Sequence, residues 1–403
     1  MTAREAASAA GTARQIKTDR SAPPPSPDGR IQLERFIRPS ALGIDPYNAA
    51  HHDYAWRRRD LARLMSNESP LPPSPHVIKA AAEALGVSNL YPNSGEDLRT
   101  RLADFAGVPL ESIVLGNGST EILDVIARLF LDEGDEAIIP IPTYAFFETQ
   151  TRSQGAIPVL VELGPDFELD IGAIGAAITA RTKLIFLCSP NNPTGNAWTG
   201  EQLRELLGLG IPVVVDQAYL ECGDAESFAP LVLEFEHLMV TRTLSKGFGL
   251  AGLRVGYAVA APRLADTITR LRIPFSVSLI ALRAGVAALE DLDDFERRKA
   301  FIVSERRRLY RALEADPAVR PYPSEGNFIL FDVRGLGIPA EEVVERLQAD
   351  GMLLRAMKAH RLKGAFVRLT VGTVDQNDRF LEAFVRLREA VAGPRFGGER
   401  APA

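Results

Sequence analysis

The chain has 403 residues, of which 46% are hydrophobic and 24% charged, so it is globular and long enough for two domains or one large domain with a lid. Its net charge of −6 gives no reason to expect binding to nucleic acid or to an anionic membrane. Its two cysteines form no Cys-x-x-Cys motif, and no apolar run reaches the roughly 18 residues of a membrane span; we therefore expect a cytoplasmic protein.

The two ends of the chain differ in composition from the rest. Residues 1–30 are rich in Ala, Ser, Thr, Pro and Arg and cannot bury enough apolar surface to order themselves, so they predict a disordered tail. They contain no apolar signal core, and Glu5 and Asp19 interrupt the basic residues that a transit peptide would need. Residues 392–403 predict a loose tail.

Between the tails, helices and short apolar runs alternate. A helix is expected at 76–85, where Gly86 ends it, and another at 201–209. Buried strands are expected at 113–115, 136–141, 158–163, 183–188, 211–216, 238–241 and 255–260. This pattern predicts an α/β fold whose large domain has a mostly parallel, seven-stranded sheet between helices.

A glycine-rich turn, Gly116-Asn-Gly-Ser119-Thr120, joins the first of these strands to an amphipathic helix. Free N–H groups and the helix dipole make such a turn suitable for a phosphate. A simple helix cap by Ser119 is the alternative interpretation.

Other polar groups follow later strands, at the sheet edge where active groups of such folds lie. Asn192 lies in the run at 189–195, Asp216 ends a Val-Val-Val run, and Tyr219 comes three residues later. A carboxylate at the end of a buried strand is costly unless a cation is nearby. The alternatives are a helix cap for Asp216, an Asn-Pro turn for Asn192 and a core or surface position for Tyr219.

Residues 243–257 form the most informative stretch. Lys246 follows the hydroxyls of Thr243 and Ser245, glycines surround it, and Arg254 comes eight residues later. The hydroxyls, the local N–H groups and Arg254 suit a phosphate, and a lysine in an apolar run loses its proton readily and can act as a nucleophile. A phosphate anchor beside a reactive amine fits pyridoxal 5'-phosphate. The alternative is a glycine-rich turn with a solvated lysine.

The pattern of expected helices and strands changes after about residue 275. Residues 280–317 predict helix, 327–333 a strand, 339–349 a helix, and 351–355 and 365–371 strands, which together make a smaller α+β unit. We expect a large domain at 76–274 and a small domain formed by 31–75 and 275–391. No histidine has a metal-ligand spacing, and the pair His51-His52 falls in a loop-like stretch, so no metal is expected.

With these residues in view, the chain resembles the fold type I pyridoxal-phosphate enzymes of the class I/II aminotransferases over roughly residues 36–390. The motifs that carry the resemblance occur in the family's order, at 116–121, 189–195, 216–219, 245–256 and 368–373. Within that group it is most similar to the histidinol-phosphate aminotransferases, through the segments at 64–68, 89–92, 324–328, 351–355 and 368–373, although Met65 and Ser69 depart from the commonest form of the first.

The resemblance implies roles for individual residues. Lys246 binds the cofactor covalently and then moves a proton, Asp216 pairs with the pyridinium nitrogen, and Asn192 and Tyr219 hydrogen-bond the ring oxygen. Tyr144 stacks on the ring. The phosphate is held by Ser119, Thr120, Thr243, Ser245 and Arg254, with Tyr91 from a partner subunit of a homodimer.

The resemblance also implies substrate contacts. Arg368 binds an α-carboxylate in a bidentate manner, unless it is a surface arginine on an edge strand, and Asn192 lies beside the same substrate. Arg355 and Tyr47 recognise the far end of the substrate.

The function implied is transfer of the amino group of histidinol phosphate to 2-oxoglutarate, a step of histidine biosynthesis. Three alternatives stay open: an aminotransferase for an aromatic or side-pathway amino acid, a decarboxylase of the threonine-phosphate type, and a non-catalytic cofactor module in a regulator. The acidic charge and the absence of a DNA-binding extension argue against the last of these.

Overall fold

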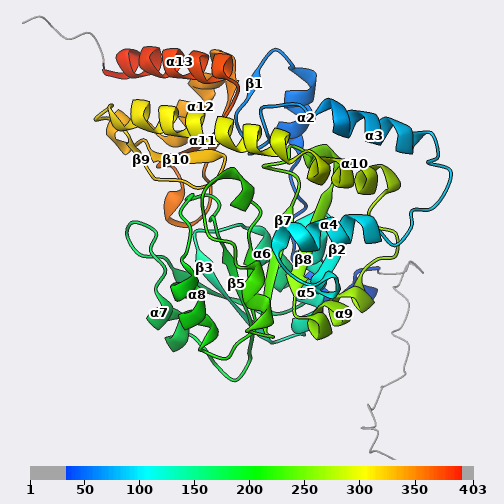
Figure 1. Cartoon of the computed structure of the whole chain (residues 1–403). Helices are drawn as coiled ribbons and strands as arrows, with labels where there is room; N and C mark the ends of the chain where they lie inside the picture. Colours follow the sequence, from blue (N-terminus) through cyan, green and yellow to red (C-terminus); the bar gives the residue numbers. More distant parts are fainter. Residues whose placement is uncertain (1–32, 393–403) are drawn as a thin grey trace, which may run out of the picture.

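The structure is a computed structural model that describes residues 33–392, so the predicted tail at 1–30 and all but the first residue of the tail at 392–403 lie outside the described residues. Figure 1 shows a lower part built around one large sheet and an upper part formed mainly by the last third of the chain, with the long helix α11 (Leu292–Glu314) running along it.

The large sheet has seven strands in the order β2-β8-β7-β6-β5-β3-β4. All neighbouring pairs are parallel except those of β8, which is antiparallel to both β2 and β7. The predicted α/β class and mostly parallel sheet are therefore confirmed. The strands are β2 (Ile113–Asn117), β3 (Glu136–Ile141), β4 (Ile157–Glu162), β5 (Thr182–Cys188), β6 (Val213–Asp216), β7 (Leu238–Thr243) and β8 (Val255–Ala260).

Apart from the edge strand β4, the sheet is buried on both faces because alternate residues of its strands pack into different cores. Ile138 belongs to one hydrophobic cluster and the next residue, Ile139, to the other. One cluster includes residues of α5 (Ser119–Phe130), α6 (Phe146–Ser153) and α9 (Pro262–Leu271). The other includes residues of α3 (Pro75–Leu85), α4 (Glu96–Ala106), α7 (Ile171–Ala176), α8 (Gly200–Leu207) and α10 (Leu279–Glu290).

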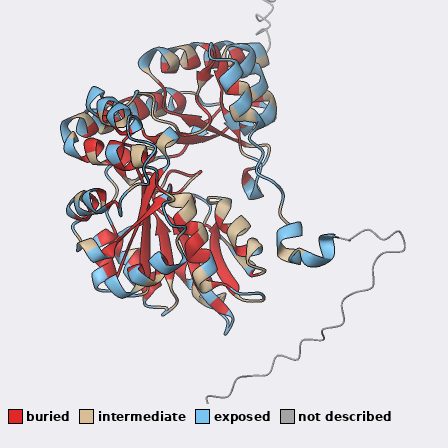
Figure 2. Cartoon of the chain, turned by 90° about the vertical axis from the view of Figure 1, so that its right-hand side faces the viewer, coloured by how far each residue is buried: buried red, intermediate tan, exposed pale blue. Residues whose placement is uncertain are grey.

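A smaller antiparallel sheet, in the order β12-β13-β10-β9, lies in the upper part. It forms a separate core with α11, α12 (Ala340–Ala349) and α13 (Val374–Ala392). Its strands are β9 (Arg320–Pro321), β10 (Phe328–Asp332), β12 (Arg355–Ala356) and β13 (Phe366–Thr370). Figure 2 shows buried residues concentrated in the large sheet and again in this upper core. The domain limits drawn from the sequence remain predictions.

Two of the predicted elements are divided in the structure. The helical stretch predicted at 280–317 is interrupted at Asp291, because the Asp291 side chain accepts a hydrogen bond from the backbone N–H of Asp294 and begins α11 as a new helix. The strand predicted at 351–355 is divided into β11 (Met352–Leu353), which pairs with β1 (Ala62–Arg63), and β12, which pairs with β13.

The remaining described elements are short. They are α1 (Pro39–Leu42), α2 (Ala50–Arg57), and the 3-10 turns η1 (Leu33–Phe36), η2 (Leu110–Ser112), η3 (Leu220–Cys222), η4 (Ala229–Leu233), η5 (Ala251–Leu253), η6 (Arg334–Leu336) and η7 (His360–Leu362).

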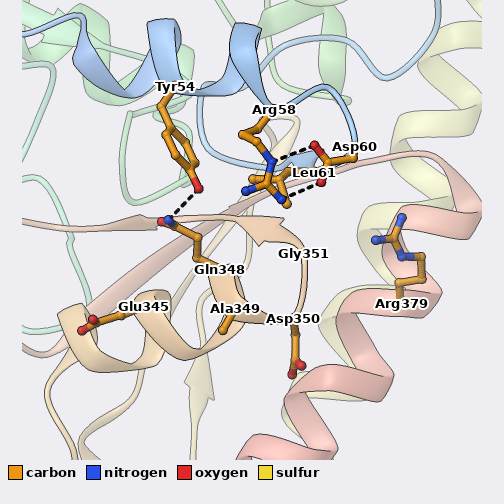
Figure 3. Close-up of a pocket in the computed structure, with 10 residues that line it drawn as sticks. All are labelled: Tyr54, Arg58, Asp60, Leu61, Glu345, Gln348, Ala349, Asp350, Gly351 and Arg379. Carbon is orange, nitrogen blue, oxygen red and sulfur yellow. Dashed lines mark hydrogen bonds and ion pairs between the residues drawn. The ribbon is translucent and has the colours of Figure 1, made fainter.

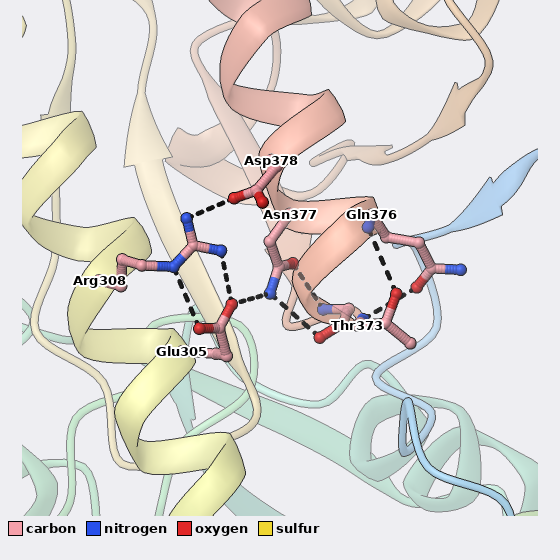
Figure 4. A network of polar contacts seen from close by, with 7 residues as sticks. Glu305, Arg308, Thr373, Gln376, Asn377 and Asp378 are labelled. Carbon is pink, nitrogen blue, oxygen red and sulfur yellow. Dashed lines mark hydrogen bonds and ion pairs between the residues drawn. The ribbon is translucent and has the colours of Figure 1, made fainter.

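A polar network fixes the turn between β13 and α13 (Figure 4). The side-chain amide of buried Asn377 bonds both the N–H and the carbonyl of Gly372, at 2.9 and 3.0 Å, and donates to Glu305 on α11 at 2.7 Å. Arg308 joins Glu305 to Asp378. These contacts anchor β13 just beyond its last residue, Thr370. They thereby help to position Arg368, which lies on the same strand.

Candidate active site

Lys246 lies just beyond β7, at the edge where the parallel strands end. Its Nζ donates to the carbonyl of Asn67 at 2.8 Å and to that of Ser66 at 3.2 Å. Burial, and secondly the charge of Arg368, lower the pKa of Lys246 to about 8. The lysine is therefore partly buried and easily deprotonated rather than solvated, and the alternative interpretation of this stretch does not hold.

Asp216 ends β6, one strand away from β7. It is 3% exposed and accepts a hydrogen bond from Thr241 at 3.0 Å. Burial raises its pKa to about 6, against the smaller opposing effects of that hydrogen bond and of the Lys246 charge. No helix capped by Asp216 follows, because the chain continues into a turn and the 3-10 turn η3. The structure therefore brings Asp216 and Lys246 into one electrostatic environment.

The ring of Tyr219 lies between these groups and the N-terminal segment. Its centroid is 5.6 Å from the Nζ of Lys246, and its hydroxyl accepts from the side-chain amide of Asn67 at 3.0 Å. Burial raises the pKa of Tyr219, so the phenol keeps its proton. Tyr219 is thus a buried side chain of the site and not a residue of a distant core.

Arg368 reaches the same place from the smaller sheet. It donates to Asn192 Oδ1 at 2.5 Å and to the carbonyl of Met65 at 2.8 Å, and its Nε has no partner within the described residues. Strand β13 lies between β12 and β10, and Arg368 is 7% exposed, so the edge-strand alternative does not hold. Burial lowers its pKa to about 10. Asn192 is therefore more than a turn residue.

The glycine-rich turn before α5 is held against β8 and Arg254. A Cβ on Gly256 would lie 2.2 Å from the backbone nitrogen of Ser119, and a Cβ on Gly118 would lie 2.4 Å from a guanidinium nitrogen of Arg254. Gly118, with a φ of 78°, occupies the cap position and no side chain caps the helix, so the simple cap by Ser119 does not form. The free N–H groups of α5 consequently face Arg254.

Hydroxyl groups complete this corner. Thr243 Oγ1 donates to Ser245 Oγ at 2.8 Å, and Arg254 Nη1 donates to the same Ser245 oxygen at 3.4 Å. Arg254 is exposed, whereas both hydroxyl residues are buried. An N-terminal helix turn, two hydroxyl groups and a guanidinium therefore converge.

Tyr144 and Thr120 lie between this corner and Asp216. Burial raises the pKa of Tyr144 to about 12. The charge of Asp216 adds to this rise, and a hydrogen bond from Thr120 opposes it. Tyr144 thus lies near both the carboxylate and the turn before α5, with its ring stacked on that of Phe146 at 5.7 Å.

Three predicted residues are exposed, and two of them, Tyr47 and Arg355, lie at the open side of the site. The third, Tyr91, is 83% exposed, and its ring packs at a tilt against that of Phe275, 5.1 Å away. Tyr47 is 74% exposed but close enough for its hydroxyl to influence the pKa of Arg368. Arg355 is exposed and donates to the imidazole of His51.

Sequence reasoning missed three neighbours of the site. Asn67 has a φ of 52° and touches both Tyr219 and Lys246, and Thr241 binds Asp216. Asn67 stood in a recognised motif without an assigned role, and Thr241 could have been found by its alternation with Thr243 on one strand. The third, His51, was placed in a loop-like stretch, but it lies in helix α2 together with His52.

The surface hollow of Figure 3 lies elsewhere and contains none of the predicted site residues. It is lined by residues of α2, α12 and α13 and the segments beside them, and two of its charged residues, Arg58 and Asp60, form a bidentate pair with each other. Within residues 33–392, no group of three or more His, Cys, Asp or Glu side chains could hold a metal, and no helix is long and apolar enough to cross a membrane.

Comparison with known proteins agrees with this geometry. Residues 59–384 match the family described as aminotransferase class I and II. A histidinol-phosphate aminotransferase of Methanosarcina mazei is 41% identical over 82% of this chain and 89% of its own, and one of Methanosarcina barkeri is 38% identical over 87% and 92%. The crystal structure of histidinol-phosphate aminotransferase from Sinorhizobium meliloti with pyridoxal-5'-phosphate superposes with a TM-score of 0.80 at 26% identity, covering 88% of this chain and 98% of that one.

Proposed function

Because this chain belongs to the class I and II aminotransferases and is a pyridoxal-phosphate-dependent enzyme, we propose that it transfers the amino group of histidinol phosphate to 2-oxoglutarate. The products are imidazole acetol phosphate and glutamate, and the pathway served is histidine biosynthesis. The proposal rests on the site's chemistry together with relatives that bear this activity in their names.

The corner at the start of α5 fits the phosphate of the cofactor. Free N–H groups and the helix dipole favour an anion there, and the hydroxyls of Thr243 and Ser245 and the guanidinium of Arg254 add donors. We assign Ser119 and Thr120 to the same cradle. Gly118 and Gly256 are required because a side chain at either position would collide with its neighbour.

When bound, pyridoxal 5'-phosphate supplies an aldehyde that joins amines and a ring that withdraws electrons while its nitrogen is protonated. Asp216 keeps that nitrogen protonated, and the pairing stabilises a carboxylate whose charged form burial otherwise disfavours. Tyr219, which keeps its own proton, and Asn192 would donate to the ring oxygen. Tyr144 would cover one face of the ring.

Lys246 supplies both the amine and the base. Its lowered pKa leaves a large fraction of the amine neutral near pH 8, and a neutral amine is required both to bind the aldehyde and to accept a proton. With the cofactor bound, the same Nζ would be the group that moves a proton between the substrate Cα and the cofactor's C4'. Asn67, whose carbonyl accepts from Nζ and whose amide holds Tyr219, positions both groups.

The observation that carries the substrate assignment is a pair of arginines, the buried Arg368 and the exposed Arg355. They are direct partners across β13 and β12, and the charge of Arg355 helps to lower the pKa of Arg368, so the pair is suited to a dianion. Histidinol phosphate has no carboxylate, and its phosphate supplies that charge. In the second half-reaction Arg368 binds the α-carboxylate of 2-oxoglutarate, and Arg355, with Tyr47, faces the far carboxylate.

A donor panel tests this function. The loaded enzyme is given histidinol phosphate, histidinol, aromatic amino acids or threonine phosphate, each with and without 2-oxoglutarate, and keto acid, glutamate and carbon dioxide are measured. We expect glutamate to form fastest with histidinol phosphate and only when 2-oxoglutarate is present. Carbon dioxide release, or a faster reaction with a donor that lacks phosphate, would contradict the proposal.

We also propose that the enzyme is a cytoplasmic homodimer in which Tyr91 reaches the cofactor phosphate of the partner subunit. Tyr91 lies in an exposed apolar patch, which also includes Leu90, Ile273 and Phe275. Burial of such a patch against a second copy would protect it from water. The two buried free cysteines suit a reducing compartment. Sedimentation of the wild type and Tyr91→Ser tests the assembly, and a monomeric wild type would exclude it.

A further inference from the structure

His51 directly faces the arginine at the open side of the site. Its Nε2 lies 3.2 Å from Nη1 of Arg355, which links α2 to β12. A guanidinium can only donate hydrogen bonds, so Nε2 must accept, and the single proton of the neutral ring resides on Nδ1. In this arrangement His51 is neutral, and the lone pair of its Nε2 accepts a hydrogen bond from Arg355.

The groups around His51 explain why it is neutral. Burial is the largest effect that lowers its pKa, followed by the neighbouring His52, Arg355 and Arg368, while a hydrogen bond with the backbone of Asn48 acts in the opposite direction. The rings of His51 and His52 are 4.2 Å apart, and the ring of Tyr47 meets His51 edge-on at 6.3 Å.

A carboxylate that acts on this pair of histidines, Glu68, is directed elsewhere. Glu68 acts on His52 rather than on His51, and it forms a bidentate pair with Arg63, with a shortest distance of 2.7 Å. The environment of His51 is therefore cationic on the side of the two arginines, and an incoming anion is the ligand that can change its protonation.

We propose, on the basis of the function proposed above, that His51 is a proton-coupled ligand for the phosphate of the amino donor. The phosphate dianion enters between Arg355 and His51 and takes over the hydrogen bond that Arg355 donated to Nε2. Nε2 then accepts one proton from the solvent and donates it in a hydrogen bond to a phosphate oxygen. His51 binds substrate and takes no part in the chemistry at Cα.

This arrangement lets one site serve two ligands of different shape. A phosphate monoester concentrates about 1.5 to 2 negative charges on one group, enough to hold a third cation beside two arginines. The acceptor 2-oxoglutarate distributes its two charges over two carboxylates, and for this ligand the two arginines suffice with His51 neutral. His51 thus contributes to recognition of the donor and not to that of the acceptor.

Calorimetric titration of the holoenzyme with imidazolylpropyl phosphate, the donor without its amino group, measures the predicted proton. The ligand cannot react, and at a pH of about 7.5 it is already almost fully dianionic, because its second pKa is about 6. Titrations in buffers of different ionisation enthalpy should show proton uptake approaching one per site. The corresponding alcohol should show none.

The variants separate a proton-coupled ligand from a residue that merely supports Arg355. His51→Gln should lose the proton uptake and bind the phosphate about tenfold more weakly, as expected for one lost charge-assisted hydrogen bond. His51→Arg should restore affinity without proton uptake. His76→Gln, which alters an exposed histidine on α3, should match the wild type in both respects.

Binding by the wild type without proton uptake, or unchanged uptake in His51→Gln, would overturn the inference even if histidinol phosphate is transaminated. If the donor panel excludes histidinol phosphate while His51-dependent proton uptake persists, the proposed function fails and the phosphate site stands for another phosphorylated donor.

Discussion

The site has two ends that are built differently. The sheet end contains Asp216, Lys246 and Arg368, and the open end contains Arg355 and Tyr47. At the sheet end, Asp216 and Arg368 are buried, Lys246 is partly buried, and each has a pKa displaced by burial and a fixed partner in the chain. At the open end, Arg355 and Tyr47 are exposed. The contrast indicates that chemistry is preorganised by burial, whereas substrate choice is left to exposed groups that an anion brings together.

The largest expected effect is at the centre of the sheet end. Lys246→Ala should lower kcat/KM by about 10⁴-fold or more, because it removes both the amine that binds the cofactor and the base. Glutamate formation is the measurement, and Lys183→Ala, which changes an exposed lysine on β5, is the control. Activity of the Lys246 variant within tenfold of the wild type would show that the sheet end does not carry the chemistry.

Asp216 should come next. Asp216→Ala should keep part of its cofactor and lower kcat by about 10²- to 10³-fold, because the ring nitrogen loses its carboxylate partner. Asp266→Ala, in an exposed pair with Arg270 on α9, should leave kcat unchanged. A near-normal kcat with full cofactor content would show that the carboxylate has another task.

The same carboxylate should reduce stability when no cofactor is present. Its folded pKa of about 6 exceeds the usual 3.9, so the folded state binds more protons and stability falls as pH rises from about 4 to about 6. Asp216→Asn should therefore stabilise the cofactor-free protein by about 3 kcal/mol at pH 7.5 and by about half as much at pH 5. Urea unfolding at both pH values measures this, and an equal or opposite change would contradict the raised pKa.

The smallest effect is expected at the open end. Arg355→Gln should raise the KM for histidinol phosphate by about 10- to 100-fold and leave cofactor binding unchanged, because an exposed guanidinium loses its phosphate contact. With histidinol as donor the change should stay below about twofold. An equal rise in KM for both donors would mean that Arg355 maintains the structure of the site and does not bind the phosphate. The distinction between the two ends would then not hold.

The sequence was most informative where local pattern and position coincide. Asp216 and Lys246 could be recognised because each closely follows an apolar run that can only be a buried strand. Asn67 and His51 could not, since their contacts are with Tyr219 and Arg355, which are separated from them by 152 and 304 residues. Such pairings depend on how the small sheet packs against the large one.

The same limit explains the misjudged elements. The division of 351–355 depends on pairing of β11 with β1, which no local pattern records. Helix α2 has eight residues with four ionisable side chains apart from tyrosine and one fully buried residue, Ala55, so its helical period is faint in the sequence. At the sheet end, where five motifs converge, the family resemblance identified residues that the local pattern alone did not. At the open end it identified fewer.

The most direct test of the account is borohydride reduction of the loaded enzyme followed by peptide mapping. The account predicts one stable pyridoxyl group per chain, on the peptide that contains Lys246, and its loss when histidinol phosphate is added before the reductant. A label on any other lysine, or a label on Lys246 that the donor cannot displace, would contradict it.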